Sequence, residues 1–390
     1  MTIRVLHVIN SLAPGGAERQ LVDLVTHHDP ARVESTVVTL WDRQGLAGEL
    51  KGAGIPVETL RLRSPRQMVR AVHRLRRYIR VASPDVVHTR LLPADLVGRV
   101  AAVLSGRPPV VSSIEAPVYD AATFTDDRSR RRWKLEALRA MDRLTGRLAS
   151  VTYVACSSTV AQSTARALAI AEAEIQVIHN STTVSESSLD RWMSPSVEPS
   201  GEVRLLTVGR LAAQKGQLYL VRTLPRLVER YPRLHLDVVG TGPLHAELRR
   251  ETVRLGVEDR VRFLGTRDDV RSLLRRAHLF VLPSLWEGLS IVALEALATG
   301  VPLVATNIPS MQEIVLDGVH AVLVPPRDAD ALAHGILRVL ADPNLRDGLS
   351  RAAREHARIR FDVRTATERY ERLYRDMVSA SVLRAGRRAS

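Results

Sequence analysis

The sequence predicts an α/β protein built from two doubly wound domains. Short runs rich in β-branched residues alternate with amphipathic helical segments along the whole chain. Most of these runs are continuously apolar, which is typical of parallel strands covered by helices on both faces. The alternation lapses once, between residues 182 and 202, and then restarts. With 390 residues, the chain is long enough for two such domains.

Thirteen strands are predicted, seven before the lapse and six after it. The first seven span residues 3–9, 35–40, 57–62, 85–89, 110–114, 151–155 and 175–178. The other six span residues 203–208, 234–239, 261–264, 279–282, 303–305 and 322–324. A serine-rich, proline-containing stretch replaces the periodic hydrophobic residues in between, so we place a linker at 186–202. The predicted domains are therefore 1–185 and 203–364.

The composition is that of a folded globular protein. Hydrophobic residues make up 45% and charged residues 25% of the chain, which excludes disordered and collagen-like classes. The single cysteine, Cys156, excludes an intrachain disulfide framework and fits a reducing compartment. Charges and prolines interrupt every long apolar run, so no transmembrane helix is expected. The first apolar run is too short for a secretory signal, and a cytoplasmic location is expected.

The net charge of +14 is concentrated in two regions. Residues 51–150 hold 20 basic and 9 acidic side chains, and residues 351–390 hold 11 and 5. A regional basic surface favours an anionic partner such as membrane lipid, a phosphorylated acceptor or nucleic acid. Aromatic residues make up only 4%, which argues against nucleic acid. Arginine supplies 53 of the 56 basic residues, so coding bias explains part of the charge.

Ligands of doubly wound sheets bind beyond the carboxyl ends of the strands, so candidate sites lie in strand-to-helix turns. The first strand leads into Gly15 and Gly16 before a helix, where a phosphate or sugar could approach the backbone. A tight turn is an equally good explanation of these glycines. In the second domain, Gly209 and Arg210 end the first strand and Lys215 follows. Two cations there would neutralise a diphosphate, although a solvated surface lysine remains an alternative.

The segment from 283 to 296 is the most informative. A turn follows the strand, and a helix is expected from Ser290 to Gly300. The amides of Gly288, Leu289 and Ser290 would lie at the helix start, suited to a phosphate. Glu295 lies among apolar residues of this helix, where a carboxylate needs a partner, and a ribose diol would supply one. Glu287, in the turn, could accept hydrogen bonds from sugar hydroxyls.

These motifs resemble those of the retaining nucleotide-sugar glycosyltransferases of family 4. Nine motifs carry the resemblance: Gly15-Gly16-Ala17-Glu18, Pro84 to His88, Cys156-Ser157-Ser158, Ile178-His179-Asn180, Val208 to Leu211 with Lys215-Gly216, Val239 to Pro243, the Glu287 and Glu295 pair, Gly300-Val301-Pro302, and Glu313 before Asp317-Gly318. The resemblance implies the glycosyltransferase B-type fold, two Rossmann-like domains facing across a cleft. It also implies that Arg210 and Lys215 hold the donor diphosphate, Glu295 the ribose and Glu287 the donor sugar. A C-terminal helix at 365–390 would cross back onto the first domain.

The first domain would hold the acceptor and departs most from the family pattern. Arg90 stands where many members have a second histidine after His88, and Glu115 where histidine or arginine is commoner. Together with Asn180 they are the acceptor-side candidates, and Ser181 and Ser290 also depart from the pattern. His88 is either catalytic or a strand-end histidine satisfied by its neighbours, and the sequence leaves both open.

Two further signals have simpler explanations, and a third indicates a membrane interface. Asp328 and Asp330 match a metal-binding pattern, but they open a predicted helix that Asp328 would cap, so no metal site and no cofactor are expected. Residues 66–80 form a basic amphipathic helix whose Val69, Val72, Leu75 and Ile79 face would pack on the sheet. The basic segment 128–134, with Trp133, is the better interfacial candidate, because tryptophan favours headgroup depth.

The predicted function is transfer of a sugar, with retention, from a nucleoside-diphosphate sugar to an acceptor hydroxyl. The family implies bacterial envelope polysaccharide or glycolipid synthesis, a lipid-linked or saccharide acceptor, and peripheral contact with the inner face of the plasma membrane. A nucleotide-sugar epimerase or hydrolase, or an inactive nucleotide-sugar-binding regulatory protein, is the alternative. No nucleic acid partner is expected.

Overall fold

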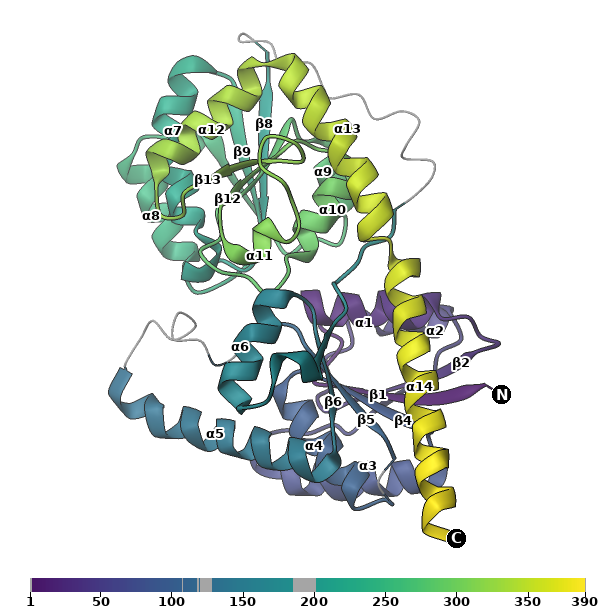
Figure 1. The fold of residues 1–390 in the computed structure, drawn as a ribbon. Coiled ribbons are helices and arrows are strands. Elements are labelled where there is room, and N and C mark those ends of the chain that lie inside the picture. The colour runs from purple at the N-terminus through teal and green to yellow at the C-terminus, as the bar shows by residue number, and fades with distance from the viewer. Residues whose placement is uncertain (1, 107, 118, 120–127, 185–200, 390) are drawn as a thin grey trace. The chain divides into compact units, whose positions relative to one another are not determined.

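The chain forms two compact units, each built on a parallel sheet (Figure 1). The structure is a computed structural model that describes residues 2–106, 108–117, 119, 128–184 and 201–389. Unit 1 comprises residues 1–181 and 363–390, and unit 2 comprises residues 182–362. Most of the predicted linker, residues 186–202, lies outside the described residues.

Unit 1 is a seven-stranded sheet in the order β3-β2-β1-β4-β5-β6-β7, with every pair parallel. Its strands are β1 (Ile3–Ile9), β2 (Val33–Thr39), β3 (Val57–Thr59), β4 (Val86–Arg90), β5 (Val110–Ile114), β6 (Thr152–Ala155) and β7 (Ile175–Val177). Valine and isoleucine dominate these strands and most of them are buried, which confirms the prediction of strands covered on both faces.

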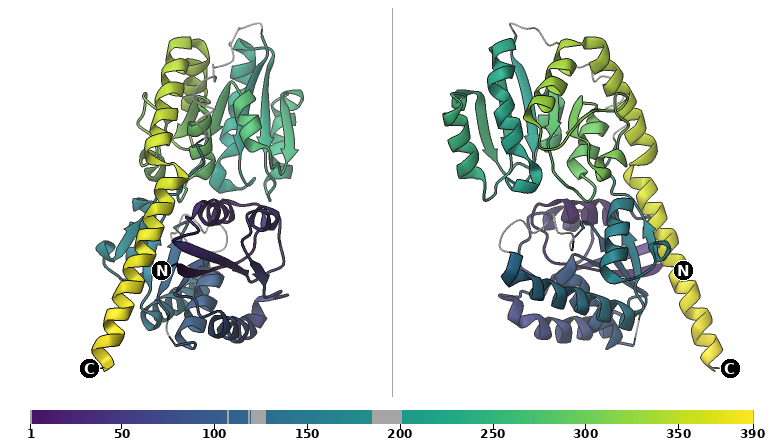
Figure 2. Two further views of the ribbon diagram at one scale, coloured as in Figure 1. Left: turned by 90° about the vertical axis from the view of Figure 1, so that its right-hand side faces the viewer. Right: turned by 60° about the vertical axis from the view of Figure 1, so that its left-hand side comes forward.

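The helices of unit 1 lie in two layers. They are α1 (Gly16–His27), α2 (Ala47–Gly52), α3 (Met68–Ala82), α4 (Leu92–Val103), α5 (Arg128–Ala149), α6 (Ser158–Leu168) and α14 (Val363–Ala389), with short 3₁₀ turns at Pro65–Gln67 and Glu172–Glu174. Helices α1 and α14 pack together against one face of the sheet. On the other face α4 packs between α3 and α5 (Figures 1 and 2).

Helix α3 corrects one expectation about the basic segment 66–80. Leu75 and Ile79 are buried as predicted and Val72 is half-buried, but Val69 is 70% exposed. At about 100° per residue, Val69 lies roughly 110° from the centre of the buried stripe, which Ala71 completes. The sequence pattern assigned Val69 to the stripe because spacing alone does not locate its centre.

Unit 2 is a six-stranded parallel sheet in the order β10-β9-β8-β11-β12-β13. Its strands are β8 (Val203–Val208), β9 (Leu234–Val239), β10 (Val261–Gly265), β11 (Leu279–Leu282), β12 (Leu303–Thr306) and β13 (Val322–Val324). Its helices are α7 (Gln217–Arg230), α8 (His245–Arg254), α9 (Val270–Arg276), α10 (Ile291–Thr299), α11 (Pro309–Gln312), α12 (Ala329–Ala341) and α13 (Pro343–Arg360), with 3₁₀ turns at Ala213–Lys215 and Glu258–Arg260. Helices α7, α8 and α12 share the main core, and α10 packs on α9 and α13. The predicted fold class is confirmed.

The chain passes between the units at two neighbouring places. Thr182, the first residue of unit 2, donates its backbone N–H to the carbonyl of Phe361 at 2.8 Å. Thr182 and Asp362 also form a parallel β-bridge. The first and the last residues of unit 2, Thr182 and Asp362, therefore lie side by side.

Candidate functional site

Two strand-end turns of unit 2 are bonded together at the carboxyl edge of its sheet. The turn after β8 contains Gln214, whose carbonyl accepts the N–H of Leu285 at 2.7 Å and whose side-chain amide donates to the carbonyl of Trp286 at 3.0 Å. Gly216 makes this approach possible, because a Cβ there would lie 1.9 Å from the carbonyl oxygen of Pro283. Its φ of +63° also favours glycine. The two turns thus form one platform.

Lys215 and Glu287 meet on this platform. The Lys215 Nζ donates to Glu287 Oε1 at 2.5 Å, and the Ser284 hydroxyl donates to the same oxygen at 2.7 Å. Glu287 is buried and Lys215 is half-buried. The sequence assigned the lysine to a diphosphate and the glutamate to a sugar, and the structure brings the two into direct contact. Burial strengthens such a charge-assisted bond, so Glu287 fixes the position of the ammonium group.

Arg210 differs from Lys215 in its surroundings. Its side chain is exposed at the end of β8, and its guanidinium forms no ion pair within the described part of the chain. Its backbone carbonyl accepts the side-chain amide of Gln217 at 3.1 Å, which ties the turn to the start of α7. Gly209 has a φ of +153°, and its carbonyl oxygen lies 2.1 Å from a Cβ built on Gly240, so neither position accommodates a side chain without strain.

Helix α10 begins and ends as its sequence predicts. Ser290 is the N-cap residue, and Gly300 follows the helix at a φ of +80°. The Ser290 hydroxyl makes no capping bond, and within the described residues it has no hydrogen-bond partner although it is buried. The preceding Gly288 and Leu289 are buried as well. A helix N-terminus carries about half a positive charge, so these groups suit an anion.

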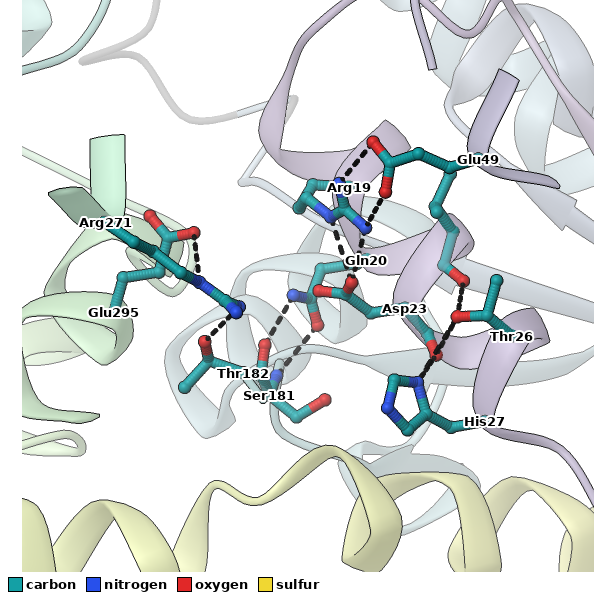
Figure 3. Close-up of polar contacts among 11 residues, drawn as sticks. Arg19, Gln20, Asp23, Thr26, His27, Glu49, Ser181, Thr182, Arg271 and Glu295 are labelled. Carbon is teal, nitrogen blue, oxygen red and sulfur yellow. Dashed lines mark hydrogen bonds and ion pairs between the residues drawn. The ribbon is translucent and has the colours of Figure 1, made fainter. Parts of the chain in front are cut away.

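Glu295 lies on α10 and forms a long ion pair with Arg271, whose Nε is 3.9 Å from its carboxylate (Figure 3). Arg271 also donates to the hydroxyl of Thr182 at 3.3 Å. The sequence placed Glu295 correctly on the helix but missed Arg271, which carries no motif. Gln214 was missed because its role comes from contacts with a distant turn, and Ser284 was missed because a serine three residues before a glutamate is not a specific signal.

In unit 1 the turn after β1 has a different form from the one expected. Gly15 is the N-cap of α1 in an extended conformation, so no positive φ explains it. A Cβ on Gly15 would lie 2.4 Å from the Glu18 carboxylate, which folds back over the helix start. Gly16 is the first residue of α1. Burial raises the pKa of Glu18. The glycine therefore makes room for a side chain of its own helix.

Gln20, in the next turn of α1, holds Ser181 in place, and Ser181 is the last residue of the first of the two segments that form unit 1. The side-chain amide of Gln20 donates to the carbonyl of Ser181 at 2.6 Å, and the Ser181 N–H donates back at 2.8 Å (Figure 3). Asn180 is buried beside it.

His88 is fully buried beneath α14. Its Nδ1 lies 2.6 Å from the Tyr374 hydroxyl and its Nε2 lies 2.7 Å from the Ser113 hydroxyl. Burial lowers the pKa of His88 well below its ordinary value, and Arg90 adds to the effect. Both ring nitrogens are occupied inside unit 1. Of the two interpretations left open by the sequence, this geometry favours the satisfied strand-end histidine.

Arg90 and Glu115 form a buried ion pair at the ends of β4 and β5. The Arg90 guanidinium lies over the Tyr370 ring, 5.6 Å from its centre. Glu115 Oε2 is buried and has no hydrogen-bond partner among the described residues. Arg90 and Glu115, two of the positions that depart from the family pattern, are therefore partners of each other.

The described residues hold no cluster of three or more histidine, cysteine, aspartate or glutamate side chains that could bind a metal ion. Asp328 caps α12 by accepting the N–H of Ala331 at 2.8 Å, as predicted. Within the described part of the chain, no helix is both long and apolar enough to span a membrane.

Comparisons with known proteins agree with this architecture. Residues 14–186 match the family model described as Glycosyltransferase Family 4, and residues 202–342 match the model described as Glycosyl transferases group 1. The chain belongs to the glycosyltransferases of the B-type fold. Its family within them is family 4.

Three similar proteins share between 22% and 34% sequence identity with this chain. Mycobacterium tuberculosis glycogen synthase is 34% identical over 228 residues, which cover 58% of this chain and 54% of that protein. The chain thus spans about half the length of this relative. An Escherichia coli UDP-Gal:alpha-D-GlcNAc-diphosphoundecaprenol alpha-1,3-galactosyltransferase is 26% identical over 309 residues, covering 75% of this chain and 76% of that enzyme. The structure of Anabaena HepE in complex with UDP-glucose has a TM-score of 0.77 at 22% identity, covering 97% of this chain and all of that one.

Proposed function

We propose that the protein transfers a sugar from a nucleoside-diphosphate sugar to an acceptor hydroxyl with retention of anomeric configuration. One observation carries the proposal. At the carboxyl edge of the unit 2 sheet, Lys215 is fixed by Glu287, and the neighbouring turn leads into the α10 N-terminus with its buried, unpartnered Ser290 hydroxyl. Arg210 ends the adjacent strand with an exposed guanidinium. Such a set of groups suits a diphosphate.

The chemical task is to stabilise the leaving group. The bond between the anomeric carbon and the diphosphate oxygen breaks, and that oxygen takes the electron pair. The acceptor oxygen then bonds to the anomeric carbon on the side from which the diphosphate leaves, and it passes its proton to the departing diphosphate oxygen. Lys215, Arg210 and the α10 amides would stabilise the negative charge that develops on the diphosphate. These cations supply that charge stabilisation without a metal ion, so chelation by EDTA is expected to leave turnover unchanged.

Two side chains would orient the donor. Glu295 would accept hydrogen bonds from the ribose hydroxyls, displacing its long contact with Arg271. Glu287 would contact the sugar while holding Lys215. His88 takes no part in this step because both of its nitrogens are engaged within unit 1.

The proposed donor is a UDP-sugar, since the HepE structure contains UDP-glucose and the E. coli relative is named for UDP-Gal. The proposed acceptor is a lipid-linked saccharide, the chemistry in the name of that same relative. Such an acceptor would place the enzyme at the cytoplasmic face of the membrane as a peripheral protein.

A panel of UDP-, GDP- and ADP-sugars tests the donor, because a bound donor raises the unfolding temperature with the logarithm of saturation. Turnover is then measured with and without lipid-linked and soluble saccharide acceptors, and NMR of the product reads the anomeric configuration. Product that forms only with an acceptor, and with the donor's configuration, supports the proposal. Conversion of the donor without an acceptor would instead indicate an epimerase or a hydrolase.

A second function is an inactive nucleotide-sugar-binding protein. The buried Arg90–Glu115 pair favours it, because these side chains occupy each other where the family implies acceptor contacts. Donor binding without product across the acceptor panel would establish this alternative.

A further inference from the structure

Ser284 is a fully buried polar residue that takes no part in the chemistry proposed above. It is the second residue after β11, and its hydroxyl donates to Glu287 Oε1 at 2.7 Å. Its carbonyl accepts the hydroxyl of Thr306, the buried last residue of β12. Strands β11 and β12 are neighbours in the sheet. Ser284 is therefore tied to the sheet through its backbone and to the candidate site through its side chain.

The two carboxylate oxygens of Glu287 differ in their partners. Oε1 accepts hydrogen bonds from both Lys215 Nζ, at 2.5 Å, and the Ser284 hydroxyl. Oε2 has no hydrogen-bond partner among the described residues, although the side chain is only 7% exposed. A carboxylate oxygen has lone pairs for two hydrogen bonds, so the protein fills Oε1 and leaves Oε2 for a ligand.

The lysine alone would not fix the orientation of this carboxylate. An ammonium group is a compact point charge on a flexible four-carbon stem, so it attracts either oxygen from a wide range of directions. The terminal torsion of a glutamate is broad, and the plane of the carboxylate turns easily without a directional bond. The Ser284 hydroxyl supplies that bond from within the same turn, and a hydrogen bond to a charged oxygen is strong. The serine therefore determines how the carboxylate is oriented.

The backbone of this turn is fixed without the Ser284 hydroxyl. The N–H of Leu285 donates to the carbonyl of Gln214, and the carbonyl of Trp286 accepts the Gln214 side-chain amide. The carbonyl of Ser284 is held by Thr306. Removing the hydroxyl would thus free the carboxylate while leaving the turn in place, so a role in positioning can be separated from a role in folding.

We propose that Ser284 is a positioning residue for sugar transfer. Its hydroxyl holds Glu287 Oε1 against Lys215 and turns Oε2 toward the donor sugar, where Oε2 accepts a hydrogen bond from a sugar hydroxyl. The ammonium group has three N–H donors and Glu287 uses one of them, so two remain for the diphosphate. The inference rests on the proposed function, because the bound donor is what both side chains would contact.

The test is steady-state kinetics of Ser284→Ala in the full-length protein, with the nucleotide sugar that most raises the unfolding temperature in the donor panel. We expect kcat to fall about tenfold and the KM for the donor to change less than about threefold, because misplaced groups matter most in the transition state. Ser350→Ala is the matched control and should behave like the wild type. Its hydroxyl is buried in α13 and has no hydrogen-bond partner among the described residues.

A double-mutant cycle separates positioning from a structural role. In the Glu287→Ala background, Ser284→Ala should lower kcat by less than about twofold, because the hydroxyl acts only through the missing carboxylate. Calorimetric titration with UDP gives a second cycle that needs no turnover. Ser284→Ala should weaken UDP binding about threefold, through the displaced ammonium group, and should have no further effect in the Glu287→Ala background.

A second substitution reaches the same carboxylate from the neighbouring strand. Thr306→Val keeps a side chain of similar size and removes the bond to the Ser284 carbonyl, so kcat should fall by about threefold. Thr223→Val removes a buried hydroxyl that is bonded within α7 and should keep the wild-type kcat. This pair tests the proposal even if Ser284→Ala does not fold.

The proposal is overturned if Ser284→Ala turns over at the wild-type rate. It is also overturned if the loss is the same with and without the Glu287 carboxylate, because the hydroxyl would then act through the fold. If the wild type binds UDP but transfers no sugar, the proposed function fails, and the UDP cycle still decides whether the serine orients the carboxylate and its lysine. A wild type that binds neither UDP nor a nucleotide sugar would overturn both.

Discussion

The carboxyl edges of the two sheets use polar residues in opposite ways. In unit 2 an exposed guanidinium, Arg210, and an unpartnered buried hydroxyl, Ser290, are left over after the internal bonds are made. In unit 1 the strand-end side chains pair within the unit, His88 with Tyr374 and Ser113 and Arg90 with Glu115, although Arg90 Nε and Glu115 Oε2 keep no hydrogen-bond partner among the described residues. Polar groups that lack internal partners are able to bind a ligand, and the proposed donor site in unit 2 is built from such groups.

The largest effect is expected for Lys215→Ala. Removing one group that stabilises transition-state charge typically costs 10²- to 10³-fold in kcat, and the loss should persist at saturating donor. Lys51→Ala, an exposed lysine in α2, is the matched control. Steady-state kinetics of the folded variants measure both. If Lys215→Ala turned over at the wild-type rate, Lys215 would not stabilise the leaving group, and the carboxyl edge of unit 2 would not differ from that of unit 1 in the way proposed.

Gly216→Ala should come next, through stability. The added Cβ would meet the Pro283 carbonyl at a positive φ, and we expect unfolding free energy to fall by about 2 kcal/mol or more. Gly52→Ala has open space around it and should change stability little. Denaturant unfolding followed by fluorescence compares the two. Equal stabilities would mean that the strand-end platform of unit 2 is loose.

Glu295→Gln should weaken donor binding about tenfold, because a hydrogen bond to a charged group is worth about 1.5–3 kcal/mol and the amide retains part of it. We expect the KM for the donor to rise and kcat to change less. Glu247→Gln, exposed on α8, serves as the comparison. Calorimetric titration with UDP gives the affinity directly. An unchanged affinity would remove Glu295 from the ribose site.

The buried histidines of unit 1 predict a pH dependence of stability. Burial lowers the pKa of His7 and of His88 well below the ordinary 6.5, so both are neutral in the folded protein while the unfolded chain takes up protons below that pH. Stability is therefore fully present above pH 6.5 and falls as pH decreases, by about 1.4 kcal/mol per pH unit for each histidine.

The variant His88→Gln should flatten this slope below pH 6.5 by the share of one histidine. Chemical denaturation between pH 7.5 and 5 gives the slopes of both proteins. A large loss of turnover in His88→Gln at pH 7.5, with stability unchanged, would show that His88 takes part in catalysis.

The smallest effect is expected for Arg271→Ala. Its contacts with Glu295 and Thr182 are long and its side chain is 41% exposed, so donor affinity should fall by less than about fivefold. Donor KM measures the change. A loss of a hundredfold would show that this arginine contacts the donor itself.

The difference between local signals and contacts across the fold explains which features could be predicted from the sequence. Strand positions and the α10 helix were predicted because continuous apolar runs and a C-terminal glycine are local signals, and all six strands of unit 2 lie where expected. The contact between Lys215 and Glu287 was not predicted, because it joins turns 72 residues apart. The exposure of Met141, Leu144 and Leu148 on α5 was also not predicted, since spacing gives a helix's faces without telling which face the sheet covers.

A crystal structure of the protein with a UDP-sugar would show whether the donor binds to unit 2. We expect the diphosphate beside Arg210, Lys215 and the α10 N-terminus, with the ribose hydroxyls on Glu295. A nucleotide bound anywhere else, with these side chains unchanged, would contradict this expectation.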